Sequence, residues 1–325
     1  MTKNQFLTDA EEYLGRIHGN TAQSTFDEKR RKLMYYSKIL YNLQQQKVIS
    51  TCNPRKITAD DIHAYVTYRR SMGTKDTTIR KDLALIAGLM DYLGNNEMRV
   101  YRSIYINKKP KSYTGRLDPL PDSTIDKVYA LARTTKSWRI LEGCVAIILG
   151  CAAGLRPQES KMLSVDSVNY EGDCPSVHVI HVKGEDKWGR ERTVPMNDGV
   201  GDIFEKYFDM RRKILARRGT VDTGLVFPPK NGRKYVTQQS MSKYKGAVFK
   251  ALKDEGVAEF SLRDGRRAYG QRMLDRGVPI EYVSHCMGHD SVETTQKYYA
   301  NYKDRYVLKQ VNGILGNVDG RQVAW

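Results

Sequence analysis

The residues of this chain that could do chemistry gather in one stretch, between Arg263 and Tyr299. Arg266 opens an amphipathic segment, His289 follows the glycine that ends the next segment, and Tyr298 comes nine residues after His289. A guanidinium group is a planar, always cationic donor that matches phosphate, and a phenolic hydroxyl can serve as a nucleophile. These residue types at these offsets indicate a site that acts on a phosphate ester.

The stretch resembles the C-terminal half of the active site of the tyrosine recombinases, the phage-integrase family. The family pattern is H-x-x-R, then G-H, then T-T-x-x-Y. This chain has, in the same order, Arg263-x-x-Arg266, Gly288-His289 and Thr294-Thr295-Gln296-Lys297-Tyr298. Arg263 departs from the family, in which this position is usually His and, in some archaeal-virus integrases, Lys.

An earlier motif and a predicted hairpin extend the resemblance. Residues 140–153 are nearly all apolar and predict a buried helix, which Gly154 ends before Arg156-Pro157-Gln158-Glu159. This matches the family's G-L-R-x-x-E, and the resemblance implies that Arg156 is the first catalytic arginine. The family's general acid is a lysine in a hairpin turn; Lys183 aligns best, with Lys187 as the alternative. The catalytic set implied by the resemblance is Arg156, Lys183, Arg263, Arg266, His289 and Tyr298.

The chemistry of strand cleavage explains why such residues must converge. A tyrosine hydroxyl that attacks a DNA phosphodiester gives a covalent phosphotyrosine and a free 5′ hydroxyl, so the bond energy is kept and neither a metal nor a nucleotide cofactor is needed. Two arginine forks stabilise the negative charge that develops on the phosphoryl oxygens. The leaving oxygen needs a proton donor, and a lysine in a cationic site suits that role.

The proton acceptor for the nucleophile is an open question, because tyrosine has a pKa of about 10. Arg263 can donate to a phosphate oxygen but cannot accept a proton. Water, His289 or direct stabilisation of the phenolate by the arginines remain as alternatives. Tyr299 adjoins Tyr298 but points about 100° away on a helix, and the nine-residue offset from His289 selects Tyr298.

A zinc site is the competing interpretation of His285, Cys286 and His289. We disfavour it because Gly288 is expected to end the helix, so the two histidines need not share a face, and the sequence has no second ligand cluster. Cys286 is interpreted as a core residue. We therefore predict no metal and no cofactor.

The predicted fold is mostly α-helical, with a small antiparallel sheet in a C-terminal catalytic domain. Residues 1–107 predict a helical core DNA-binding domain of about four helices, 108–117 a basic linker, and 118–325 the catalytic domain with a C-terminal assembly tail. The first domain shows an apolar helical stripe and a Thr58–Asp61 helix cap. A hairpin is expected from Val177–Val182 and Arg192–Pro195, and a short strand at Leu225–Phe227. Cations expected to contact phosphates are Arg69, Arg70, Lys75, Arg80 and Lys81.

The bulk composition favours a polyanionic partner. The net charge is +17, which fits DNA better than a membrane. The sequence shows neither a signal peptide nor an apolar run of about 18 residues, and five scattered cysteines fit a reducing compartment. We expect an intracellular protein, cytoplasmic or nucleoid-associated, of cellular, viral or mobile-element origin.

The resemblance implies a site-specific DNA recombinase, or integrase, that works through a 3′-phosphotyrosyl intermediate. Its implied partners are double-stranded DNA and further copies of itself, a dimer on one site and a tetramer on two. Three alternatives stay open: a type IB topoisomerase-like activity without strand exchange, a catalytically silent DNA-binding regulator, and a phosphodiesterase of another kind. The lack of metal-ligand clusters in the sequence disfavours the last.

Overall fold

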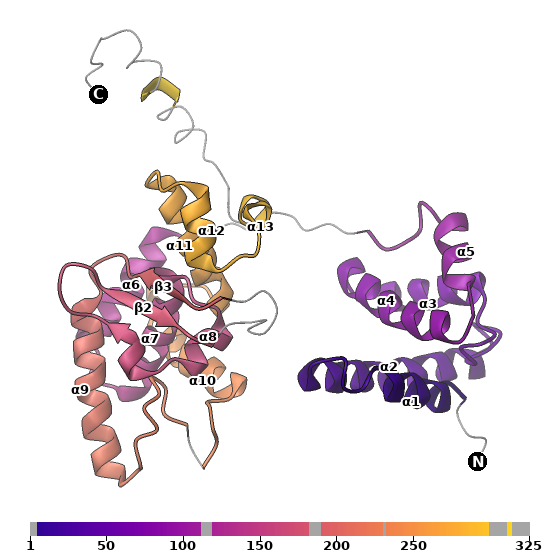
Figure 1. Ribbon diagram of the computed structural model, residues 1–325, viewed down its shortest axis with the longest axis horizontal. Helices are drawn as coiled ribbons and strands as arrows, with labels where there is room; N and C mark the ends of the chain where they lie inside the picture. The colour runs from indigo at the N-terminus through magenta and orange to yellow at the C-terminus, as the bar shows by residue number, and fades with distance from the viewer. Residues whose placement is uncertain (1–4, 112–118, 182–189, 230–231, 299–310, 314–325) are drawn as a thin grey trace. The chain divides into compact units, whose positions relative to one another are not determined.

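A computed structural model describes residues 5–111, 119–181, 190–229, 232–298 and 311–313. The chain divides into two compact units, Met1–Gly115 and Arg116–Trp325, and each is described by itself (Figure 1). Every helix in the described ranges is too short or too polar to cross a lipid bilayer.

Unit 1 is a bundle of helices with its own apolar core. Five helices are described in it, where the sequence indicated about four: α1 (Gln5–Ile17), α2 (Gln23–Gln45), α3 (Ala59–Ser71), α4 (Asp76–Tyr92) and α5 (Glu97–Ile104). Figure 1 draws α1 and α2 as one layer and α3 and α4 as a second. The apolar stripe of α4 is confirmed, since Ile79, Leu83, Ile86 and Met90 are all buried. The Thr58–Asp61 capping box that starts α3 is confirmed as well.

Two of the cations expected to contact phosphate form ion pairs with aspartates of unit 1. Arg69 is buried, forms an ion pair with Asp82 at 3.0 Å and donates to the Tyr65 hydroxyl at 2.9 Å. Arg70 forms a two-pronged pair with Asp76, both bonds 2.8 Å long. Arg69 is therefore not the exposed phosphate contact that the sequence predicted, because Asp82 and Tyr65 hold its guanidinium inside the bundle.

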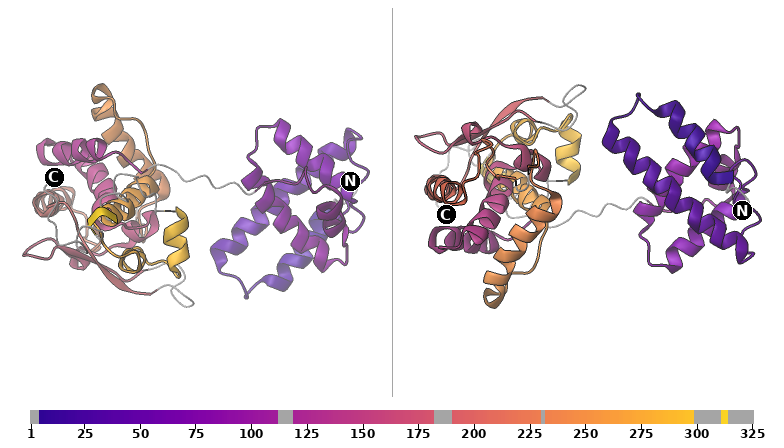
Figure 2. Two further views of the ribbon diagram at one scale, coloured as in Figure 1. Left: turned by 90° about the horizontal axis from the view of Figure 1, so that it is seen from above. Right: turned by 90° about the horizontal axis from the view of Figure 1, so that it is seen from below.

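Unit 2 is built around one buried helix. Its helices are α6 (Asp122–Thr134), α7 (Trp138–Ala153), α8 (Pro157–Met162), α9 (Gly201–Arg218), α10 (Gln238–Ala251), α11 (Leu262–Asp275), α12 (Ile280–Met287) and α13 (Val292–Tyr298). Every residue of α7 from Leu141 to Ala153 is buried, which confirms the predicted buried helix. It packs against α6, α10 and α11 (Figure 2). A helix that is apolar all round needs such cover on every side.

The sheet of unit 2 is small and antiparallel, in the order β1-β2-β3. Its strands are β1 (Val168–Asn169), β2 (Ser176–Val179) and β3 (Arg192–Pro195), and Val177 pairs with Val194. The predicted mostly helical class with a small antiparallel sheet is thus confirmed. The strand expected at Leu225–Phe227 is wrong, since Leu225 forms only a single bridge, to Ser164, while Val226 and Phe227 are core residues.

Candidate active site

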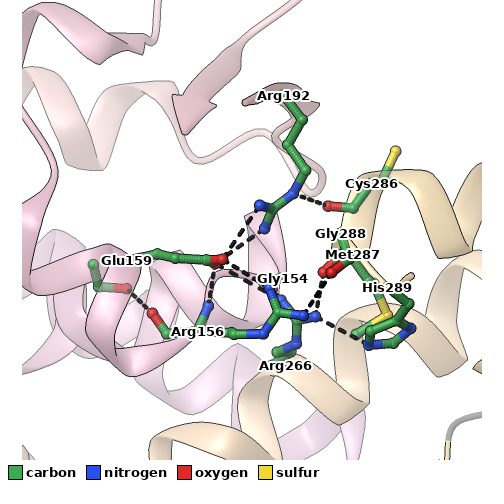
Figure 3. A network of polar contacts seen from close by, with 10 residues as sticks. Gly154, Arg156, Glu159, Arg192, Arg266, Cys286, Met287, Gly288 and His289 are labelled. Carbon is green, nitrogen blue, oxygen red and sulfur yellow. Dashed lines mark hydrogen bonds and ion pairs between the residues drawn. The ribbon is translucent and has the colours of Figure 1, made fainter. Parts of the chain in front are cut away.

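Arg156 is placed by the abrupt end of α7. Gly154 has a φ of 61°, a left-handed conformation that favours glycine, and its amide caps α7 at Gly150. Pro157 then starts α8, so Arg156 lies in the short turn between two helices. Its Nη1 donates to Glu159 at 2.8 Å and its Nη2 to the Gly288 carbonyl at 2.6 Å (Figure 3).

Arg266 enters the same place from α11. A capping box between Ser261 and Asp264 starts this helix, so Arg266 is held one turn and a half inside it. Arg266 is only 3% exposed. Its Nη1 donates to the Gly154 carbonyl at 2.5 Å, and its Nη2 donates to the Met287 carbonyl. The end of α7 and the end of α12 are therefore tied together through one guanidinium.

Glu159 is the carboxylate at the centre of this cluster. Its oxygens lie 2.8 Å from Arg156, 3.0 Å from Arg192 and 3.8 Å from Arg266 (Figure 3). Burial alone would raise the pKa of this carboxyl, but the surrounding guanidinium groups outweigh burial and lower the pKa. A single anion thus holds three cations that would otherwise repel one another.

Arg192 is the residue of the site that the sequence analysis missed. It begins β3, is 5% exposed, pairs with both oxygens of Glu159 and donates from Nε to the Cys286 carbonyl at 2.8 Å. The signal was available: alternate residues of a strand share a face, and Arg192 shares the buried face with Val194. A cation at a core position of a strand requires a buried partner.

His289 follows the glycine that ends α12, as the sequence predicted. Gly288 has a φ of 58°, and the backbone N–H of His289 donates to the Ser284 carbonyl. The ring lies between two groups: Nε2 is 3.1 Å from Arg266 Nη2, and Nδ1 is 2.8 Å from Thr295 Oγ1 on α13. Burial, followed by the charges of the nearby arginines, lowers the pKa of His289 to about 3, so the ring is neutral at pH 7.

The structure brings together three of the predicted residues, Arg156, Arg266 and His289. Arg263 lies in the first turn of α11 with an exposed side chain. Tyr298 is the last residue of α13. Lys183 and Lys187, and all of the proposed assembly tail except residues 311–313, lie outside the described residues. In the described ranges, no group of three or more His, Cys, Asp or Glu side chains is arranged to hold a metal.

The cluster can bind a tetrahedral anion. Its guanidinium groups converge on the carbonyls of Gly154, Met287 and Gly288, and phosphate oxygens are stronger acceptors of such charge-assisted bonds than carbonyls are. A helix that ends in a tyrosine adjoins the cluster through His289 and Thr295. Cations grouped in this way beside a tyrosine suit chemistry on a phosphodiester.

Comparison with known proteins identifies the family. The model of the phage integrase family matches residues 121–305, and the chain belongs to this family of tyrosine recombinases. It is 25% identical to tyrosine recombinase XerD of Proteus mirabilis, over 82% of this chain and 81% of that protein. It is 24% identical to tyrosine recombinase XerC of Roseiflexus castenholzii, over 79% and 82%.

Solved structures show the same fold. The Tn1549 transposon integrase in complex with a circular intermediate DNA superposes with a TM-score of 0.65 at 17% identity, covering 94% of this chain and 98% of that one. XerH recombinase bound to a palindromic difH substrate gives a TM-score of 0.62 at 15% identity, covering 94% and 84%. The family therefore rests on the sequence match, and the fold on both comparisons.

Proposed function

We propose that this chain is a site-specific DNA recombinase that cuts and rejoins strands through a 3′-phosphotyrosyl intermediate. The observation that carries the proposal is the convergence of Arg156, Arg266 and His289 from three separate segments, next to the helix that ends in Tyr298. Membership of the phage integrase family supports the same activity.

The reaction exchanges one phosphodiester for another. The Tyr298 oxygen forms a bond to phosphorus and loses its proton to water or His289. The bond from phosphorus to the 5′ oxygen breaks, and the 5′ oxygen takes a proton from Lys183 or Lys187. Rejoining reverses the steps with the 5′ hydroxyl of a second strand. Arg156 and Arg266 donate to the phosphoryl oxygens, where charge increases most in the transition state.

Arg263 has a different part in this scheme. Its side chain is exposed and three residues before Arg266 on the same helix, so the two lie on neighbouring positions of one face. It can supply a third donor to the phosphate but no base. The ring of His289 is neutral, but its lowered pKa, about 3, makes it a weak proton acceptor, so water and direct stabilisation of the phenolate by the arginines stay open beside it.

Double-stranded DNA is the proposed substrate, and unit 1 offers a surface for its backbone. A shallow groove on α2 is lined by Asp27, Arg30, Arg31, Met34, Tyr35 and Lys38. Lys75, which precedes the adjacent α4, is exposed, and so are Arg80 and Lys81 within that helix. Lysines, arginines and a tyrosine on two packed helices suit phosphate contacts, which fix position without reading sequence. We propose this surface, without the buried Arg69, as the region of unit 1 that contacts the DNA backbone.

Strand exchange requires several active sites at once, so we propose dimers on one DNA site and a tetramer on two. A relative of known structure, lambda integrase, is described as a dimer bound to a core site, which supports assembly on DNA. The tail after Tyr302 is the segment we propose to join neighbouring copies. We propose that the enzyme integrates or excises a viral or mobile element inside the cell.

A nicked suicide substrate tests the proposed function directly. Cleavage next to the nick releases a short fragment, so the covalent protein–DNA adduct accumulates, and the adduct should form equally well in EDTA. Tyr298→Phe should abolish the adduct, and Tyr299→Phe should retain it. An adduct formed by the Tyr298→Phe variant would show that another residue is the nucleophile. DNA binding without any adduct would indicate a catalytically silent regulator. Relaxation of supercoiled DNA without strand exchange would indicate a topoisomerase.

A further inference from the structure

A threonine that the reaction scheme does not use is buried beside His289. Thr295 lies on α13, one turn before Tyr298, and its side chain is 0% exposed. Its Oγ1 is 2.8 Å from Nδ1 of His289. The preceding Thr294 is only half-buried, and its hydroxyl lies 3.5 Å from Ser291 Oγ. The two threonines of one motif therefore have different surroundings.

The hydrogen bonds of the ring decide where its proton lies. Arg266 is 3.1 Å from Nε2 and can only donate, so Nε2 must present a lone pair. A neutral imidazole carries one proton, which then lies on Nδ1 and is donated to Thr295 Oγ1. The lowered pKa of His289, about 3, agrees with a neutral ring between these two partners.

We propose that Thr295 is a positioning residue that holds the Nδ1 proton of His289 and so keeps the Nε2 lone pair directed at the arginine cluster. The same side-chain hydrogen bond joins α13 to that cluster, because His289 contacts Arg266 on its other side. This inference rests on the proposed function, in which Tyr298 at the end of α13 is the nucleophile. A partner that fixes the tautomer and orientation of a histidine is a recurrent device at active sites.

Valine in place of Thr295 would keep the shape and remove the acceptor. The Nδ1 proton would then be buried without a partner, which is unfavourable. Moving the proton to Nε2 would place two donors, the ring N–H and the Arg266 N–H, against each other. The ring would have to turn or shift, and the arginine cluster would lose its fixed acceptor. Serine at 295 keeps the hydroxyl and should keep the arrangement.

The first experiment measures the tautomer in the DNA-free protein. Ring ¹⁵N chemical shifts of His289 should show a protonated Nδ1 and an unprotonated Nε2 in the wild type and in Thr295→Ser. Thr295→Val should change both shifts, and Thr294→Val should change neither. A wild-type ring protonated on Nε2, or a Thr295→Val spectrum like that of the wild type, would overturn the inference.

The second experiment measures formation of the covalent adduct on a nicked substrate at saturating DNA. Thr295→Val should slow the adduct by about 10- to 100-fold, the scale on which partners of a functional histidine act, with unchanged DNA affinity. Thr295→Ser should recover most of the rate and Thr294→Val should match the wild type. Equal losses in Thr295→Val and Thr295→Ser would make the residue merely structural. Absence of any adduct from the wild type would refute the proposed function instead, and the nitrogen shifts would still decide the role of Thr295.

Discussion

Arg192 and Glu159 form a buried two-pronged ion pair, with Nη1–Oε1 and Nη2–Oε2 separations of 3.2 and 3.0 Å. The pair links β3 to α8, and Arg192 continues the link to α12 through the Cys286 carbonyl (Figure 3). Two buried charges gain little over an apolar pair, but removing one of them leaves the other unpaired at a large cost. The pair therefore holds the carboxylate of Glu159 in place, and this carboxylate contacts Arg156 and Arg266.

Glu159→Gln should destabilise unit 2 severely, because the near-isosteric amide leaves Arg192 buried without its anion. We expect a loss of about 3–5 kcal/mol in the free energy of unfolding, measured by urea denaturation. Asp209→Asn is the matched control, since its pair with Lys213 is at the surface, and it should leave the unfolding midpoint almost unchanged. Equal effects of the two substitutions would contradict a structural role for the buried pair.

Arg156→Ala and Arg266→Ala should each slow DNA cleavage by about 10²-fold or more, because these groups act mainly on the transition state. Affinity for the DNA site should change little. The rate is measured in a single turnover at saturating DNA, with thermal unfolding of each variant to confirm a folded chain. A large loss of affinity at an unchanged rate would make the two arginines anchors for the phosphate backbone.

His289 should make stability depend on pH. Its pKa is about 3 in the folded chain and about 6.5 in an unfolded one, so only the unfolded state takes up a proton between these values. The stability it contributes is fully present above about pH 6.5 and falls as the pH drops from there toward 3. Urea unfolding at several pH values should show a smaller decline in His289→Gln than in the wild type. Identical pH profiles would refute this.

Gly288→Ala should be more harmful than an alanine at another left-handed glycine. Both Gly288 and Gly219 have a φ of 58° and end a helix, but a Cβ at Gly288 would lie 2.8 Å from the Arg192 guanidinium, whereas one at Gly219 meets nothing within 4 Å. The left-handed conformation alone costs roughly 1–3 kcal/mol. Comparing the unfolding free energies of the two variants isolates the contact with Arg192, and adduct formation should fall only in Gly288→Ala.

Cations on α2 should contribute to DNA binding through charge alone. Arg31 and Lys38 line the groove on α2 and are exposed. Replacing either by alanine should weaken binding to all DNA sequences alike and reduce the slope of log K against log salt by about one. Lys213→Ala on α9 serves as the control for loss of a surface charge. An effect confined to one DNA sequence would instead indicate a base contact.

The sequence by itself determined the family, the chemistry and most of the helices, because these depend on residue types at fixed short spacings. The order of Arg156, Arg266, His289 and Tyr298 is a property of the chain, and so are the glycine that ends α12 and the buried character of α7. Local rules of helix capping and periodicity operate over a few residues, within reach of a linear reading.

Only the tertiary structure decided which charges are buried and what they hold. Nothing near Arg69 in the sequence shows that Asp82 lies beside it, and nothing near Arg192 shows that Glu159, on another element, neutralises it. The state of His289 depends likewise on Arg266 and Thr295, which reach it from α11 and α13. Electrostatic energies depend on distance and burial in space, and a fold brings together groups whose separation along the chain carries no such information.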